Sequence, residues 1–325
     1  MASLTIVTAD PPQPLPATIA EWCARYLGAT PVHSFITEAP ASQLWGFELD
    51  DRRVVAVKVR PASTRLDACT AAHRAAYAAG IDCPAPLAGP APMRGDPQLS
   101  VVAETWRPDG AVWPAEDTPG SYGRLQARLV TALAGIDPGP LDPPPRWLRY
   151  DHGSDGRLWP PVADGAPDPD AIVRELPAGL TRFAETARDR LLAASLPPVV
   201  GHAGLSGVHV RWLEGPGGTP VPVVHGWEEL AARPEAVLAG CLAATFNDLP
   251  DQPRIAPVPD GEVALAAYQA ARGRTFTPEE RELAWAASTW VACHNAALEH
   301  LAGAAGQITH QIMTDGALRL RLAGC

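Results

Sequence analysis

The amino-terminal third of the chain combines short runs of alternating apolar and polar residues with two helical stretches. Two such runs meet at the turn-forming sequence Asp50-Asp51-Arg52 and predict a β-hairpin. An alanine-rich helical stretch follows and stops at Gly80, a common helix terminator. A connector is expected over 104–110, after the last strand of this region. The expected elements are helices at 17–27 and 64–79 and strands at 43–49, 53–59 and 99–103.

Helical patterns dominate the remainder of the chain. Proline, glycine and acidic residues are dense over 111–120, which predicts a boundary between an N-lobe at 1–110 and a C-lobe at 111–325. The same composition over 137–170 predicts irregular structure. Thr277-Pro278-Glu279-Glu280 supplies an N-cap, a proline at N1 and a glutamate at N3, which together start a helix. In the C-lobe we expect helices at 122–134, 180–194 and 277–301 and a hairpin with strands at 208–213 and 220–224.

The composition is that of a globular protein with an acidic surface. Of the 325 residues, 46% are hydrophobic and 19% charged, and the formal net charge is −10. An acidic chain argues against nucleic acid as a partner and favours cationic or neutral small molecules. No stretch is apolar enough to span a membrane, and the amino-terminal residues do not resemble a signal peptide. The cysteines lack CxxC spacing and are expected to be reduced thiols in a cytoplasm.

Three segments carry a resemblance to a known family. The run VVAVK ends in Lys58, GHAGLSGVHVRW occupies 201–212, and VVHGWEEL occupies 223–230. In this order and spacing they resemble the strand lysine, catalytic loop and metal-binding segment of the aminoglycoside-phosphotransferase and choline-kinase family. The resemblance covers nearly the whole chain, and it implies an α+β, two-lobed protein-kinase-like fold with a small β-rich N-lobe and a large α-helical C-lobe. It also implies nucleotide contacts from Lys58, Glu104 and Trp106.

The expected catalytic hairpin, 201–230, departs from the family pattern at three positions. Gly204 stands where the resemblance places the catalytic aspartate, which orients the acceptor hydroxyl and can take its proton. His209 and Gly226 replace the two ligands of magnesium, an ion that prefers oxygen donors. Glu228 is a candidate substitute ligand, with a solvated or helix-capping role as the alternative. The resemblance implies ATP and magnesium as cofactors, but these changes argue against both, and no metal site is expected.

Lys58 also lacks the partner that the family supplies, a glutamate on the following helix. Asp67 is the only acidic residue between 63 and 80. It lies near the start of the predicted helix, which is early for that role. The sequence therefore leaves the partner of Lys58 open.

Three histidines of the expected catalytic hairpin, His202, His209 and His225, are the candidate catalytic residues. If the family geometry holds, they converge on one cleft. Histidine serves as a general acid or base near neutral pH, and three together could bind a transition metal. Alternatively, His202 and His225 support the loops through hydrogen bonds, which leaves His209 as the single new group.

Three functions stay open at this point. The first is a non-phosphorylating, pseudokinase-like protein that binds a small molecule in the cleft between its lobes, or steadies a partner protein. The second is a repurposed enzyme that uses the histidines for acid–base chemistry, such as a cyclisation or elimination in secondary metabolism. The third is an active ATP-dependent small-molecule phosphotransferase with displaced metal ligands. The alanine-rich C-terminal helices could pack within the chain or across a homodimer.

Overall fold

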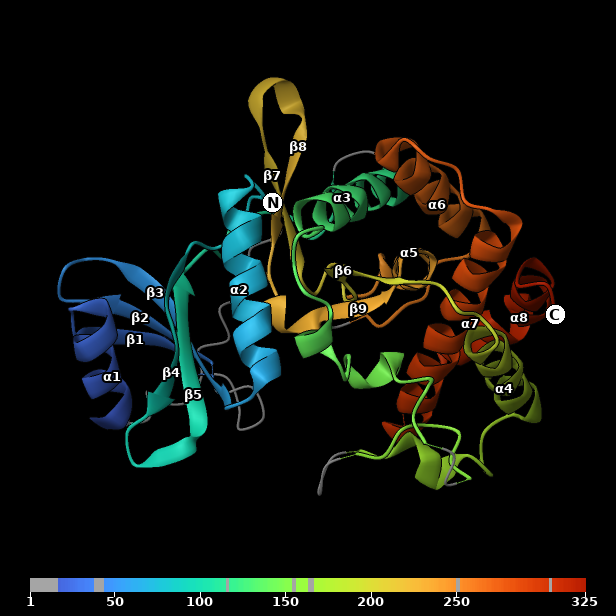
Figure 1. The fold of residues 1–325 in the computed structure, drawn as a ribbon, viewed down its shortest axis with the longest axis horizontal. Helices are drawn as coiled ribbons and strands as arrows, with labels where there is room; N and C mark the ends of the chain where they lie inside the picture. The colour runs from blue at the N-terminus through green and yellow to red at the C-terminus, as the bar shows by residue number, and fades with distance from the viewer. Residues whose placement is uncertain are drawn as a thin grey trace. The chain divides into compact units, whose positions relative to one another are not determined.

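The computed structural model describes residues 17–37, 44–114, 117–153, 156–162, 167–249, 252–303 and 306–325. The chain divides into two compact units, Met1–Pro108 and Asp109–Cys325 (Figure 1). The first unit is built on a β-sheet, and the second is mainly helical. Among the described residues, no helix combines the length and apolarity needed to cross a membrane.

A five-stranded antiparallel sheet organises the first unit. Its strands lie in the order β1-β2-β3-β5-β4, so β1 and β4 form its edges. The strands are β1 (Pro31–Thr37), β2 (Leu44–Leu49), β3 (Val54–Pro61), β4 (Pro86–Met93) and β5 (Asp96–Thr105). The helices are α1 (Ala17–Leu27) and α2 (Thr64–Ala78).

The alternation of side chains along β3 separates an apolar face from a charged one. Val55 and Val57 are buried in one core together with Trp22 of α1. Because successive side chains of a strand point to opposite faces, Lys58 lies on the face away from this core. The sheet therefore presents its lysine on a separate side from its main hydrophobic contacts.

The second unit consists of six α-helices and two short antiparallel strand pairs among its described residues. Strand β6 (Pro198–His202) pairs with β9 (Leu230–Pro234), and β7 (Val210–Glu214) pairs with β8 (Pro220–Val224). The helices are α3 (Thr118–Ala132), α4 (Ala178–Leu192), α5 (Glu235–Thr245), α6 (Val258–Arg272), α7 (Pro278–Leu301) and α8 (Gln307–Leu322). Helix α7 packs against α4, α5 and α8, and its Trp290 is fully buried. The long helix α7 thus runs through the core of this unit.

The predicted start of α7 is confirmed. Thr277 Oγ1 accepts a hydrogen bond from the Glu280 backbone N–H at 3.2 Å, and Glu280 Oε2 accepts one from the Thr277 N–H at 2.9 Å. These reciprocal bonds satisfy two N–H groups that the first turn of a helix otherwise leaves without a partner.

Both hairpins predicted from sequence are confirmed, since β2 pairs with β3 and β7 pairs with β8. The expected connector over 104–110 is wrong at its first two residues, because β5 continues through Thr105. Strand β4 is missing from the sequence prediction because it carries prolines at 86, 90 and 92. An edge strand tolerates proline, since the N–H groups on its outer side need no partner in the sheet.

The stretch 137–170 is less irregular than predicted. Its described residues include three short 3₁₀ helices, Gly139–Leu141, Arg146–Leu148 and Pro169–Ile172. Strands β1, β6 and β9 were also not expected from the sequence. The pair β6–β9 matters most, because it brings the two ends of the expected catalytic hairpin together.

Candidate functional site

The short strands of the second unit bring the three candidate histidines together. The β7–β8 ladder ends at the pair Val210–Val224, and the His225 N–H then donates to the His209 carbonyl oxygen at 2.8 Å. Strand β6 ends at His202, whose ring centroid lies 5.8 Å from that of His209. The chain thus gathers the three histidines from the ends of three strands.

His202 acts as a support between two loops. Its Nε2 lies 2.9 Å from the His225 carbonyl oxygen, and its Nδ1 accepts a hydrogen bond from the Gly204 N–H at 3.2 Å. The proton therefore resides on Nε2. Burial lowers the pKa of His202 to about 4, so the ring is neutral near pH 7. The His202 ring therefore bridges the backbone at His225 and the backbone at Gly204.

His209 packs directly against Gly204 and Gly226. Its Nδ1 lies 3.0 Å from the Gly204 carbonyl oxygen, so Nδ1 carries the proton of the neutral ring. Gly226 has a φ of +68°, and a Cβ built on it would lie 2.3 Å from His209 Cδ2. A Cβ on Gly204 would lie 3.3 Å from both His209 Nδ1 and Glu229 Cβ. Gly204, His209 and Gly226 therefore form one packed cluster, with the imidazole occupying the space above Gly226.

The described residues contain no group of three or more histidine, cysteine, aspartate or glutamate side chains arranged to hold a metal ion. The convergence of His202, His209 and His225 thus does not produce a metal-binding geometry. Glu228 lies in the 3₁₀ helix Trp227–Glu229, where its charge raises the pKa of His202 against the larger effect of burial.

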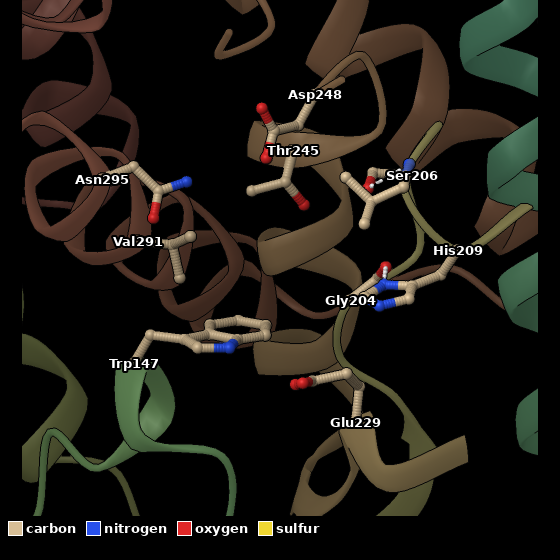
Figure 2. Close-up of a pocket in the computed structure, with 10 residues that line it drawn as sticks. Trp147, Gly204, Ser206, His209, Glu229, Thr245, Asp248, Val291 and Asn295 are labelled. Carbon is tan, nitrogen blue, oxygen red and sulfur yellow. Dashed lines mark hydrogen bonds between the residues drawn. The ribbon is translucent and has the colours of Figure 1, made fainter. Parts of the chain in front are cut away.

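A cavity of about 200 Å³ opens beside this cluster (Figure 2). Figure 2 shows side chains from separate parts of the chain pointing toward it, including those of Trp147, His209 and Asn295. Of the sequence-predicted positions, His209 and Gly204 line the cavity, whereas His202, His225, Gly226 and Glu228 are not among its lining residues. The lining residues are Trp147, Gly204, Ser206, Val208, His209, Glu229, Thr245, Asp248, Val291 and Asn295.

The described lining of this cavity carries negative charge and an aromatic ring. Glu229 and Asp248 supply two carboxyl groups, and no lysine or arginine is among the lining residues. Burial raises the pKa of Asp248 to about 6, although the Arg254 backbone N–H donates to Asp248 Oδ1 at 3.1 Å. A carboxyl group held in this way is ionised near neutral pH and lacks the hydration of an exposed one.

Sequence reasoning did not single out Trp147, Asp248 or Asn295. Trp147 lies on a 3₁₀ helix inside the stretch expected to be irregular, and Asp248 lies in the loop after α5. Asn295 lies on α7, where the sequence predicts a helix without assigning this residue a role. None of the three belongs to a motif, so tertiary structure alone brings them to the cavity.

The first unit answers the open question about Lys58. Its Nζ lies 2.9 Å from Glu104 Oε1, and both side chains are largely buried. Ala56 pairs with Glu104 and Lys58 with Val102, so lysine and glutamate are diagonal neighbours on one face of the sheet. Strand β5 therefore supplies a carboxylate partner for Lys58.

The other predicted nucleotide contact, Trp106, directly follows β5. Its backbone N–H donates to the Val54 carbonyl oxygen at 3.0 Å, and its ring meets that of Phe35 edge-on, with the centroids 5.3 Å apart. These contacts fix the residue beside the sheet. Nucleotide binding by Lys58, Glu104 and Trp106 stays a prediction.

No protein-family model matches the sequence, and no curated protein matches it significantly. Solved structures of kinases match its fold. A spectinomycin phosphotransferase in complex with ADP and spectinomycin has a TM-score of 0.54 and 9% identity, with 95% of this chain and 94% of that chain covered. A microcompartment-associated aminopropanol kinase has a TM-score of 0.55 and 16% identity, with 94% and 100% covered. An amicoumacin kinase has a TM-score of 0.55 and 11% identity, with 89% and 86% covered.

These likenesses confirm the predicted fold class. The chain has the kinase-like fold of the aminoglycoside phosphotransferases, with an amino-terminal five-stranded antiparallel sheet followed by a helical region. At identities this low the likeness establishes the fold and not the activity.

Proposed function

We propose that this protein is a non-phosphorylating, pseudokinase-like relative of the aminoglycoside phosphotransferases that binds a small organic cation in the cavity of its second unit. The observation that carries the proposal is the packing of the His209 imidazole over Gly226. A Cβ built at position 226 would lie 2.3 Å from His209 Cδ2, so a side chain there would collide with the imidazole ring. The space that a metal-binding aspartate would need is therefore filled.

The missing groups are those on which phosphoryl transfer depends. This reaction relies on positioning and on neutralisation of phosphate charge by metal ions. Gly204 supplies no carboxylate to orient an acceptor hydroxyl, and His209 and Gly226 supply no oxygen ligand from a side chain. Loss of a single such group typically costs on the order of 10² to 10⁴ in rate. We expect the loss of all three to leave no measurable transfer.

The charge of the cavity selects the class of ligand. Glu229 and Asp248 attract a cation, and Trp147 offers an aromatic face on which a cation can be stabilised. A cation would also compensate the partly buried Asp248 carboxylate, whose pKa burial raises to about 6. The aminopropanol kinase of the same fold is likewise named for a molecule with an amino group.

Three measurements test the proposal. Calorimetry with ATP and magnesium, and incubation with radiolabelled ATP and a panel of hydroxylated and aminated acceptors, should show neither magnesium-dependent binding nor transfer. Titration with tetramethylammonium, followed by NMR, should perturb the Trp147 indole signal, whereas the uncharged tert-butyl alcohol should not. Tight magnesium-dependent ATP binding, or labelled product, would overturn the non-phosphorylating assignment. Such a result would favour the phosphotransferase with displaced ligands.

A second candidate function is acid–base catalysis by His209 on a bound small molecule. It is favoured by the position of this residue, which lines the cavity while its Nδ1 faces the Gly204 carbonyl oxygen. In the neutral ring this leaves the lone pair on Nε2, as a general base requires. A His209→Gln variant that binds the cation normally, and converts the physiological substrate at the wild-type rate, would exclude this function.

A further inference from the structure

A second cavity lies beside the one described above. It has a volume of about 500 Å³ and shares two lining residues, Asp248 and Asn295, with the first cavity. Its other lining residues are Gln252, Pro253, Arg254, Leu298, Glu299, Ala302, Gln307 and Ile308. The two cavities thus meet at one carboxyl group and one amide.

One stripe of helix α7, continued by its C-cap residue Ala302, lines both cavities. Val291 and Asn295 line the first, and Asn295, Leu298 and Ala302 line the second. Their spacing of four, three and four residues places them on a single face of the helix. At 1.5 Å per residue this stripe extends for about 16 Å. The cavities therefore follow one another along α7.

The chemistry of the lining changes along this stripe. The first cavity holds Glu229, Asp248 and the ring of Trp147, whereas Leu298 of α7 and Ala302, the residue that ends α7, add apolar side chains to the second cavity. Asn295 and Glu299 are the polar α7 residues of its lining. Glu299, at the edge of the second cavity, accepts hydrogen bonds from the Ile308 and Thr309 N–H groups at 3.0 and 2.9 Å. Because these bonds cap α8, the Glu299 carboxylate already serves the protein itself.

From this arrangement we infer that the ligand has two parts, a cationic head in the first cavity and an apolar extension along Leu298 and Ala302 in the second. The inference rests on the proposed binding of a cation. Asp248 and Asn295 lie where head and extension join. Asp248 contributes charge, and Asn295 offers an amide that can donate or accept a hydrogen bond.

Trimethylammonium ions with alkyl chains of increasing length are suitable probes. Tetramethylammonium fills only the head site, whereas the hexyl homologue adds five methylenes. Each fully buried methylene raises affinity about fourfold. We expect hexyltrimethylammonium to bind at least tenfold more tightly than tetramethylammonium, as measured by NMR titration. In the Leu298→Gln variant the ratio of the two affinities should fall close to one, because glutamine replaces an apolar side chain in the wall of the second cavity.

A matched control is available on the neighbouring helix. Leu318 of α8 is an exposed leucine outside both cavities, so Leu318→Gln should keep the full ratio. The apolar extension would be refuted if the wild type bound the two probes with equal affinity, or if Leu298→Gln and Leu318→Gln reduced the affinity ratio equally. Either result would leave the proposed cation site intact. Failure of tetramethylammonium to bind at all would instead contradict the proposed function, and with it this inference.

Discussion

At the scale of single residues, Gly204, His209 and Gly226 form one packed cluster. The imidazole is held by the Gly204 carbonyl oxygen and lies over Gly226. A carboxylate introduced at position 226 alone would force the ring out of its place. The three residues therefore behave as one unit, and a change at one of them is felt at the others.

Substitution of Gly226 by alanine should be unusually destabilising. Gly226 and Gly273 have nearly the same backbone conformation, with φ of +68° and +65°, but a Cβ on Gly273 would have nothing within 4 Å. Gly273→Ala should cost about 1 kcal/mol, the usual penalty of this conformation. Gly226→Ala should cost about 1–3 kcal/mol more, because its Cβ meets the His209 ring. Urea denaturation measures both.

A double variant separates the collision from the backbone effect. If the excess cost comes from the ring, Gly226→Ala should cost less in a His209→Ala background than in the wild type. If Gly226→Ala and Gly273→Ala lowered the free energy of unfolding equally in the wild-type background, the His209 ring would not be held in this position.

At the scale of elements, sequence predicted what depends on local periodicity and missed what depends on distant pairing. The hairpin β7–β8 and the start of α7 follow from neighbouring residues, and both are confirmed. Strands β6 and β9 pair across nearly thirty residues of chain, which no local pattern encodes. For the same reason the family pattern led to His209, whereas Trp147 and Asp248 emerged only from the folded chain.

The capping box of α7 offers a test at this scale. Thr277→Ala removes the hydroxyl that accepts from the Glu280 N–H, and should lower the free energy of unfolding by about 1 kcal/mol. Thr275, an exposed threonine two residues earlier, provides the control. Thr275→Ala should change stability by less than about 0.5 kcal/mol in the same urea titration. A comparable loss in both variants would show that the cap contributes nothing specific.

At the scale of the whole molecule, one carboxylate links several helices of the second unit. Glu235, in the first turn of α5, accepts hydrogen bonds from Tyr268 Oη at 2.7 Å and Arg272 Nε at 2.8 Å, both on α6. Arg274 lies 3.1 Å from Glu235 and 2.8 Å from Glu280 of α7. Because a buried charge is costly unless it is paired, these contacts make Glu235 a stabilising residue only while it is ionised.

The contribution of this network to stability should therefore depend on pH. Burial alone would raise the pKa of Glu235, but the hydrogen bonds from Arg272, Tyr268 and Arg274 outweigh it and lower the pKa from 4.5 to about 2. A carboxyl group with a lowered pKa in the folded state stabilises the protein above its unfolded pKa, and this contribution disappears as the pH falls toward the folded value. Glu235→Gln should thus cost about 2 kcal/mol at pH 7.

The difference in free energy of unfolding between the wild type and Glu235→Gln should shrink as the pH falls from about 4.5 to about 2, because the wild-type glutamate then becomes neutral as well. Urea titrations at a series of pH values measure this convergence. The control is Glu262→Gln, at an exposed glutamate of α6, which should follow the wild-type curve throughout. A difference that stays constant from pH 7 to pH 2 would mean that Glu235 contributes through its shape and not through its charge. The three helices would then be joined by packing alone.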